Sequence, residues 1–137
     1  MTTRAQIRSA INALITNSAL VSNIVISRNA DVTDLDKYIR IYFGEGEDLQ
    51  ESNQPFVDAE IFVSYGSTSE DDDRLDSIMN QVYSAFAANH GDLLSAELVT
   101  VGADPISAIQ RTGFNYEPTD GNQHNVLTYR FVIRYFE

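Results

Sequence analysis

Two stretches in which every second residue is apolar constrain the fold of this chain more than any other feature. The first is "FVDAEIFVSYG" at residues 56–66, and the second is "NVLTYRFVIRYFE" at residues 125–137. Successive side chains of a β-strand point to opposite faces of its sheet, so this alternation predicts two half-buried strands. The expected core positions are Val57, Ala59, Ile61, Val63 and Tyr65 in the first strand and Leu127, Tyr129, Phe131, Ile133 and Tyr135 in the second.

Further strands are expected around these two. "KYIRIYFG" at residues 37–44 also alternates, and "SNIVISRN" at 22–29 is typical of a short strand. Residues 99–118 predict a strand with an irregular start. The segment 44–55 is acidic, contains glycine and ends at Pro55. It is expected to form a long loop between two strands, and long loops inside compact domains are often functional.

The first of two predicted helices spans residues 2–15. Its apolar residues recur at three- and four-residue spacing, which places them on one face of a helix. They are Ile7, Ala10, Ile11, Leu14 and Ile15. Thr3 followed by Gln6 fits a capping box, in which each residue satisfies a backbone N–H of the other.

The second predicted helix spans residues 67–91 and carries the most regular apolar stripe of the chain. The stripe consists of Leu75, Ile78, Met79, Val82, Tyr83 and Phe86. Ser69 is the expected N-cap, and acidic residues follow it in the first turn, where the helix dipole favours negative charge. Gly91 fits the C-terminal cap. Residues 92–98 are expected to form a short helical turn.

These elements predict the α+β fold class. We expect a mixed, largely antiparallel β-sheet packed with an N-terminal helix and a long central helix. Strands that follow one another in the sequence are joined mostly by turns or loops, which favours antiparallel pairing. A chain of 137 residues is long enough to bury a core of its own, so residues 1–137 are expected to form a single domain.

The charge balance argues against several classes of partner. The chain has 20 acidic and 9 basic residues, for a net charge of −11. This disfavours tight binding to nucleic acid and to anionic membranes, and it favours solubility. The chain contains no cysteine, which excludes disulfides and thiolate chemistry. No long apolar run is present, so we expect no signal peptide and no membrane span, and a reducing, cytoplasm-like setting.

The acidic run "EDDDRLD" at residues 70–76 is the most conspicuous local feature. Glu70, Asp71, Asp72 and Asp73 are candidates for binding a divalent cation, because hard cations take clustered carboxylates. The run lacks the spacing and the glycine of a calcium-binding loop. The alternative interpretation is a well-capped, solvated start of the central helix.

No pattern in the sequence indicates an enzyme. His90 and His124 lie far apart, and neither belongs to a metal-binding motif such as HExxH. The chain has no GxSxG nucleophile motif, no phosphate-binding loop and no GxGxxG motif. We therefore expect no catalytic residue and no cofactor.

The strand positions opposite the core register are unusually apolar and basic for a solvated face. They include Tyr38, Tyr42, Phe56, Phe62, Val132 and Phe136, and the arginines Arg40, Arg130 and Arg134. Either helices cover both faces of the sheet, or this second face binds another protein, because aromatic residues and arginine are enriched where proteins meet. In the second case the arginines would pair with acidic residues of a neighbouring subunit.

Four stretches of the sequence, taken in order, are similar to one known family. They are "RAQIRSAINALI" at residues 4–15, "YIRIYFGEGEDL" at 38–49, "SEDDDRLDSIMNQVYSAF" at 69–86, and a closing hairpin with Gly113, Phe114, Asn115, Tyr116, Leu127, Thr128 and Tyr129. Together they resemble the tail terminator proteins of long non-contractile-tailed phages, the lambda U-type family. The loops at residues 22–36 and 45–55 depart from the family pattern, so partner contacts there cannot be carried over.

The resemblance implies a structural virion protein without enzymatic activity. Such a protein forms a ring of itself, a hexamer, on the head-proximal end of the tail tube. It stops polymerisation of the tube protein and presents a surface to a head-completion or connector protein. The implied location is the head–tail junction of the virion, after assembly in the host cytoplasm. DNA passes only through the lumen, no membrane is involved, and magnesium could assist assembly by screening charge.

Residue chemistry supplies candidates for the interfaces of such a ring. They are Arg40, Arg130, Arg134, Glu45, Glu47, Asp48, Glu51, Asp71 and Asp72. One rival is another head–tail junction component or a tube subunit, which would polymerise without limit. A rival of a different class is a small cytoplasmic enzyme or a ligand-binding α+β domain, which would require a deep pocket with converging carboxylates.

Overall fold

The computed structural model describes residues 1–18, 23–25, 31–51, 54–117 and 124–137. Within these residues the elements are, in chain order, α1 (Arg4–Asn17), β1 (Ile24–Val25), β2 (Lys37–Glu51), β3 (Gln54–Ser67), α2 (Asp72–Phe86), α3 (Ala88–Thr100), β4 (Ala108–Glu117) and β5 (Asn125–Tyr135). The predicted strand at residues 22–29 is seen only at β1, and much of that stretch lies outside the described residues.

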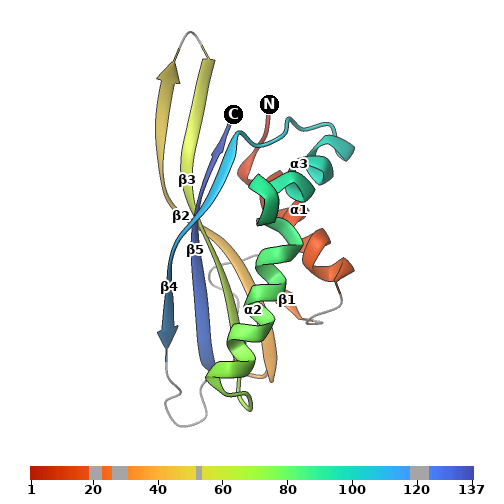
Figure 1. Ribbon diagram of the computed structural model, residues 1–137, viewed down its shortest axis with the longest axis vertical. Coiled ribbons are helices and arrows are strands. Elements are labelled where there is room, and N and C mark those ends of the chain that lie inside the picture. The colour runs from red at the N-terminus through yellow and green to blue at the C-terminus, as the bar shows by residue number, and fades with distance from the viewer. Residues whose placement is uncertain (19–22, 26–30, 52–53, 118–123) are drawn as a thin grey trace.

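The described strands form one sheet with the order β1-β2-β3-β5-β4. The β1–β2 pair is parallel, and the other three pairs are antiparallel. The predicted fold class is therefore confirmed, including the N-terminal helix and the long central helix. Figure 1 shows that the described helices all lie on one side of the sheet. The alternative in which helices cover both faces is thus wrong for the described part of the chain.

The core lies between the sheet and the helices, and it uses the predicted strand register. Ile61, Val63 and Tyr65 of β3 are at most 1% exposed. Phe131 of β5 is also 1% exposed, and its ring packs edge-to-face against Phe86 of α2, with centroids 5.2 Å apart. Burial of this apolar face is the main free energy that holds the helices on the sheet.

The start of α1 confirms the predicted capping box. The Thr3 hydroxyl accepts a hydrogen bond from the Gln6 backbone N–H at 3.2 Å, and the Gln6 side chain accepts one from the Thr3 N–H at 2.9 Å. The helix then buries Ile7, Ile11 and Ile15 completely, as its apolar stripe predicts.

The predicted loop at residues 44–55 is wrong. β2 continues to Glu51 and β3 begins at Gln54, so this segment belongs to a long antiparallel hairpin with a bulge between Phe43 and Gly46. Glycine and acidic residues have low strand propensity, which is why the sequence suggests a loop. Antiparallel pairing with β3, which continues past the bulge as far as Glu51 and Gln54, overrides that preference.

The boundaries predicted for the central helix are also wrong at both ends. Its N-cap is Asp71, not Ser69, and α2 ends at Phe86 instead of running to Gly91. Asn89, His90 and Gly91 have positive φ angles of 56°, 61° and 74°, and they turn the chain into α3. The predicted short turn at 92–98 is therefore part of a full helix.

The stretch predicted as a strand from residue 99 to residue 118 begins later than expected. α3 continues to Thr100, and β4 starts only at Ala108. None of the helices in the described part of the chain combines the length and the apolar character needed to cross a membrane.

Candidate assembly surface

The face of the sheet opposite the helices, called here the open face, carries rows of side chains from neighbouring strands. Tyr42 of β2 lies opposite Phe62 of β3, which lies opposite Arg130 of β5. In the adjacent row Arg40 of β2 lies opposite Ser64 of β3, which lies opposite Thr128 of β5. The hydroxyl oxygens of Ser64 and Thr128 are 2.7 Å apart. The strand registers thus place the aromatic pair and the two arginines on adjacent rows of one surface, and all four residues belong to the face that the sequence suggests for a protein partner.

Arg130 of β5 is bonded to β4 at the open face. Its Nε donates to Thr112 Oγ1 at 2.9 Å and its Nη2 donates to the Thr112 carbonyl at 3.3 Å. Thr112 lies in a bulge of β4, and the next residue is Gly113. A Cβ at Gly113 would lie 3.0 Å from Arg130 Nη2, so the glycine leaves room for the guanidinium. Arg130 is exposed, and no carboxylate among the described residues is bonded to it.

Aromatic rings of β2 and β3 lie beside the arginines on the open face. The rings of Tyr42 and Phe62 are stacked with centroids 5.1 Å apart. Tyr38 packs edge-on against His124 at 4.8 Å, and the Arg40 guanidinium lies 5.6 Å from the Tyr38 ring. Burial raises the pKa of Tyr38, and the positive charge of Arg40 partly opposes that rise. This arrangement of amphipathic aromatics and arginine is typical of protein–protein interfaces.

Arg134 ties the far end of β5 to β3. Its Nε and Nη2 donate to the two carboxylate oxygens of Asp58 at 2.7 and 2.8 Å, and its guanidinium lies 4.7 Å from the Phe56 ring. Phe56 packs edge-on against Phe136 at 6.1 Å. Within one copy Arg134 thus binds Asp58, and its pairing with a neighbouring subunit stays a prediction.

The Asp58–Arg134 pair predicts a pH-dependent contribution to stability. Hydrogen bonding from Arg134 lowers the pKa of Asp58 below its ordinary value, 3.8. The contribution is therefore present above the unfolded-state pKa and is lost as the pH falls through the lower folded-state pKa. We expect Asp58→Asn to cost about 1 kcal/mol at pH 7 and less at pH 2, as measured by urea unfolding. Asp48→Asn, an exposed control, should change stability little at either pH; equal costs of Asp58→Asn at both pH values would contradict the assignment.

The distal part of the β2–β3 hairpin, residues 44–51 and 54–60, is called here the arm. Its residues 57–60 still pair with β5, and only its tip, from Leu49 and Phe56 outward, extends past β5. β5 stops pairing with β3 at Val57, and Figure 1 shows the hairpin running on beyond the helices. The arm contains six acidic residues and no basic one. The acids are Glu45, Glu47, Asp48, Glu51, Asp58 and Glu60. Glu45, Glu47 and Asp48 are exposed, whereas the side chain of Glu51 lies outside the described part of the structure.

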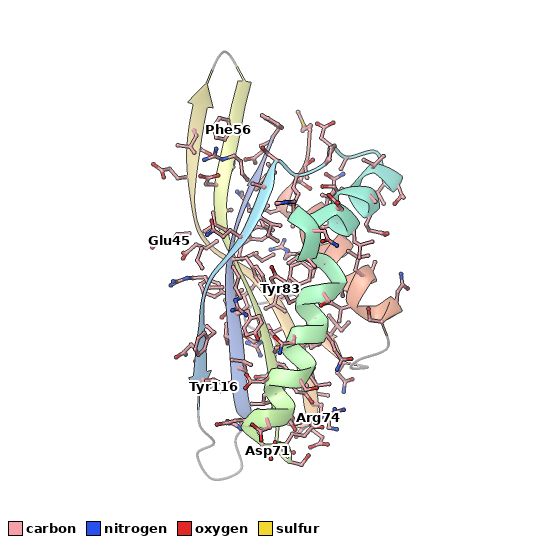
Figure 2. The ribbon with its side chains drawn as sticks, viewed as in Figure 1. Glu45, Phe56, Asp71, Arg74, Tyr83 and Tyr116 are labelled. Carbon is pink, nitrogen blue, oxygen red and sulfur yellow. The ribbon has the colours of Figure 1, made fainter. Side chains whose placement is uncertain are left out.

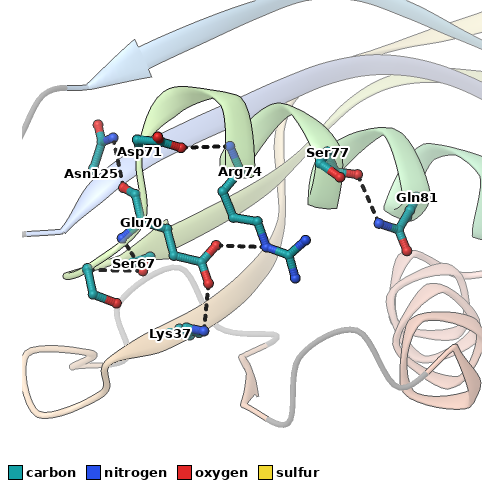
Figure 3. A network of polar contacts seen from close by, with 9 residues as sticks. Lys37, Ser67, Glu70, Asp71, Arg74, Ser77, Gln81 and Asn125 are labelled. Atoms are coloured by element: carbon teal, nitrogen blue, oxygen red, sulfur yellow. Dashed lines mark hydrogen bonds and ion pairs between the residues drawn. The ribbon is translucent and has the colours of Figure 1, made fainter.

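The acidic start of α2 is a separate network with internal partners (Figure 3). The Glu70 carboxylate accepts from Lys37 Nζ at 2.6 Å and faces Arg74 Nε at 3.4 Å. Asp71 caps the helix by accepting the Arg74 backbone N–H at 3.0 Å, and Asp72 accepts from the Asn125 side chain at 3.0 Å. These acids thus join β2, α2 and β5 within one copy of the chain.

The carboxylates at this helix start do not converge as metal ligands do. Within the described residues, no group of three His, Asp or Glu side chains is placed to hold a metal ion. Cation binding by Glu70, Asp71, Asp72 and Asp73 stays a prediction.

Burial and the nearby Glu70 carboxylate raise the pKa of Tyr65 to about 12, so this buried hydroxyl stays neutral at physiological pH.

The capping role of Asp71 gives a direct mutational prediction. We expect Asp71→Ala to lower the free energy of unfolding by about 1 kcal/mol, because an orphan N–H of the first turn loses its acceptor. Ser69→Ala, at the position that the sequence suggests for the cap, should have little effect. Denaturant unfolding of the two variants measures the difference. Similar losses in both variants would show that Asp71 does not have this role.

The sequence names most of the open-face residues but misses Thr112, Gly113 and Asp58 as their supports. The alternation that marks β3 and β5 as strands puts Asp58 and Arg134 on the same face. That these two residues pair becomes visible only once the β3–β5 register is known. The bulge that brings Thr112 to Arg130 has no comparable sequence signal.

Comparison with known proteins gives no match in sequence, but solved structures share the fold, including the two that follow. No protein-family model matches the chain, and no curated protein matches it. A chain in the virion of a native gene transfer agent particle has a TM-score of 0.68 at 9% identity, over 95% of this chain and 94% of that one. A chain in an extracellular contractile injection system, described as PVC sheath/tube terminator in the extended state, has a TM-score of 0.58 at 14% identity and covers 100% of this chain.

These two likenesses define the class of fold. The α+β fold described above occurs in a chain of a virion and in a chain of an injection system, and this chain spans 57% of the length of the latter. At such low identities the likeness is one of fold alone. The narrower resemblance to the lambda U-type family has no support from a family model.

Proposed function

We propose that the chain is a tail terminator, a structural component of a virion tail. In this role six copies form a ring on the head-proximal end of the tail tube, stop the polymerisation of the tube protein and present a surface for joining the head. The support is the fold shared with a gene transfer agent virion chain along nearly the full length of both, and with an injection-system chain described as sheath/tube terminator.

The observation that carries this proposal is the asymmetry of the sheet. Described helices cover one face, and the open face carries stacked Tyr42 and Phe62 beside exposed Arg130. A face of this composition on which none of the described helices packs suits a protein partner. A contact between this face and a different surface of the next copy closes into a ring when the rotation between copies allows it.

The remaining parts of the proposal follow from the charge and the partners of such a ring. The partners would be further copies of this chain, the tail tube protein and a head-completion or connector protein, with DNA only passing through the lumen. Acidic walls would let DNA slide, because binding to phosphates requires positive charge. Magnesium should favour assembly by screening repulsion between chains of net charge −11. Membership of the lambda U-type family rests on the order of elements and the closing hairpin.

A second candidate is another component of the head–tail junction or of the tube itself. It is favoured by the virion comparison, which concerns a whole particle and not a terminator. Tube subunits add to an open end without limit, whereas a terminator stops at one ring. The two candidates therefore differ in the products that they assemble.

Negative-stain electron microscopy of the purified chain, with and without magnesium, distinguishes these candidates. The terminator proposal predicts discs of one diameter with a central hole, because the contacts close on themselves. Open-ended tubes of variable length would contradict it and support the tube candidate. Particles no larger than one chain under all conditions would contradict both.

A further inference from the structure

We propose that the acidic arm of one copy lies on the open face of the next copy, against Arg130 and the neighbouring Tyr42, Phe62 and Arg40. This inference rests on the proposed ring and specifies its contact. It assigns the two halves of the interface to different elements of the chain.

The arm supplies the acidic half. It carries six acidic residues and no basic one, and Glu45, Glu47 and Asp48 are exposed. Figure 2 shows Glu45 on the side of the sheet away from Tyr83 and the helices. Glu47 and Asp48 lie opposite Asp58 and Val57, which still pair with β5, and only the tip of the arm extends past β5 as a two-stranded ribbon. An isolated ribbon of this kind is marginally stable in water and gains from packing against a partner.

The open face supplies the basic and aromatic half. Arg130 is pre-oriented by its two hydrogen bonds to Thr112, so docking costs less side-chain entropy than it would for a mobile cation. The stacked Tyr42 and Phe62 lie in the same row and offer apolar area next to the charge. An acidic strand laid across this row would place carboxylates on a guanidinium and methylenes on aromatic rings.

The arm of the same copy cannot fill this position. β2 and β3 run from the open face directly into the arm as continuous strands, so the arm extends away from Arg130 within the same sheet. The occupant with the matching charge is therefore a second copy. Because the acids of the arm and the row of Arg130 are separate patches of the sheet, the proposed contact joins unlike patches and leaves one of each available until a ring closes.

The other predicted acidic partner, the start of α2, fits this role less well. Glu70, Asp71 and Asp72 already have the internal partners Lys37, Arg74 and Asn125. Recruiting them to a neighbour would cost the bonds that hold α2 to the sheet. The structure therefore favours Glu47 and Asp48 over Asp71 and Asp72 as the acids of the interface.

Charge reversal on each side tests the contact. Arg130→Glu alone, and Glu47→Arg with Asp48→Arg in another chain, should each raise the concentration needed for ring formation by roughly 10- to 100-fold, because like charges then meet. Combining all three substitutions in one chain should restore assembly. Mixing the two variant chains should also restore it, because a ring in which the two variants alternate places opposite charges at every contact.

Two controls separate docking from folding. Asp73→Arg makes the same change in charge at the exposed start of α2 and should leave assembly near the wild-type concentration. Thermal unfolding of each variant monomer checks that the fold persists. Assembly is measured as mass by light scattering over a range of protein concentrations.

The outcomes separate this inference from the proposed function. Wild-type rings that are unaffected by Arg130→Glu or by reversal of the arm would overturn the docking contact and leave the ring intact. Failure of the triple variant to assemble, while each variant monomer stays folded, would also overturn the contact. A wild-type chain that forms no ring at any concentration would overturn the ring, and the contact with it.

Discussion

Phe131→Ala should lower the free energy of unfolding by about 3–5 kcal/mol, the largest stability loss expected here from one substitution. The Phe131 side chain is 1% exposed and lies in an aromatic cluster with Phe86, Tyr83 and Tyr129 at ring distances of 5.2, 6.1 and 6.4 Å. Its removal leaves a cavity between β5 and α2 that rigid neighbours can fill only in part. Urea unfolding followed by circular dichroism measures the loss.

The matched control for this substitution is Val99→Ala. Val99 is 56% exposed on α3, so its truncation should change the free energy of unfolding by less than about 0.5 kcal/mol. A loss below about 1 kcal/mol for Phe131→Ala would mean that α2 does not pack on the sheet as described.

Gly66→Ala should cost about 1–3 kcal/mol, because the Tyr38 ring occupies the space above Gly66. A Cβ at Gly66 would lie 2.5 Å from Tyr38 Cζ and 2.7 Å from the Tyr38 hydroxyl oxygen. Tyr38 has little room to move, since it is 7% exposed and packs against His124. The substitution would therefore disturb the part of the open face that Tyr38 occupies.

A double-mutant cycle checks this cause. With Tyr38→Ala present, Gly66→Ala should cost much less, because the clashing ring is gone. Denaturant midpoints of the wild type, both single variants and the double variant give the coupling free energy. Additive costs in the double variant would contradict the proposed clash.

The sequence predicts the body of the fold well because its strands carry an unambiguous period of two. The register that buries Ile61 and Phe131 also places Arg40 and Arg130 on the opposite face, so the alternation alone is enough to derive both the core and the open face. The α1 capping box is equally local, since Thr3 and Gln6 are three residues apart. These features depend on neighbouring residues in the chain, and sequence patterns record them directly.

The features that the sequence does not predict depend on distant pairings. Residues 44–51 have the composition of a loop, and only their pairing with β3 makes them part of β2. Asp58 and Arg134 are separated by 76 positions in the chain, and their bond follows from the β3–β5 register. At the start of α2, both Ser69 and Asp71 have suitable cap side chains, and the network around Glu70 decides where the helix begins.

The proposed interface combines both kinds of feature. Its arginines and aromatics are visible as a strand face in the sequence, whereas its acidic half is visible only once residues 44–51 are recognised as part of β2. An acidic patch and a basic, aromatic patch on the same sheet give the chain the two unlike surfaces that the proposed ring requires.

The mass of the wild-type assembly, measured by light scattering after size exclusion over a wide range of protein concentrations, tests the central claim most directly. We expect one species of six chains whose mass stays constant as the concentration rises, because every contact in a closed ring is satisfied. A mass that keeps growing with concentration, or a monomer at all concentrations with and without magnesium, would contradict the proposed ring.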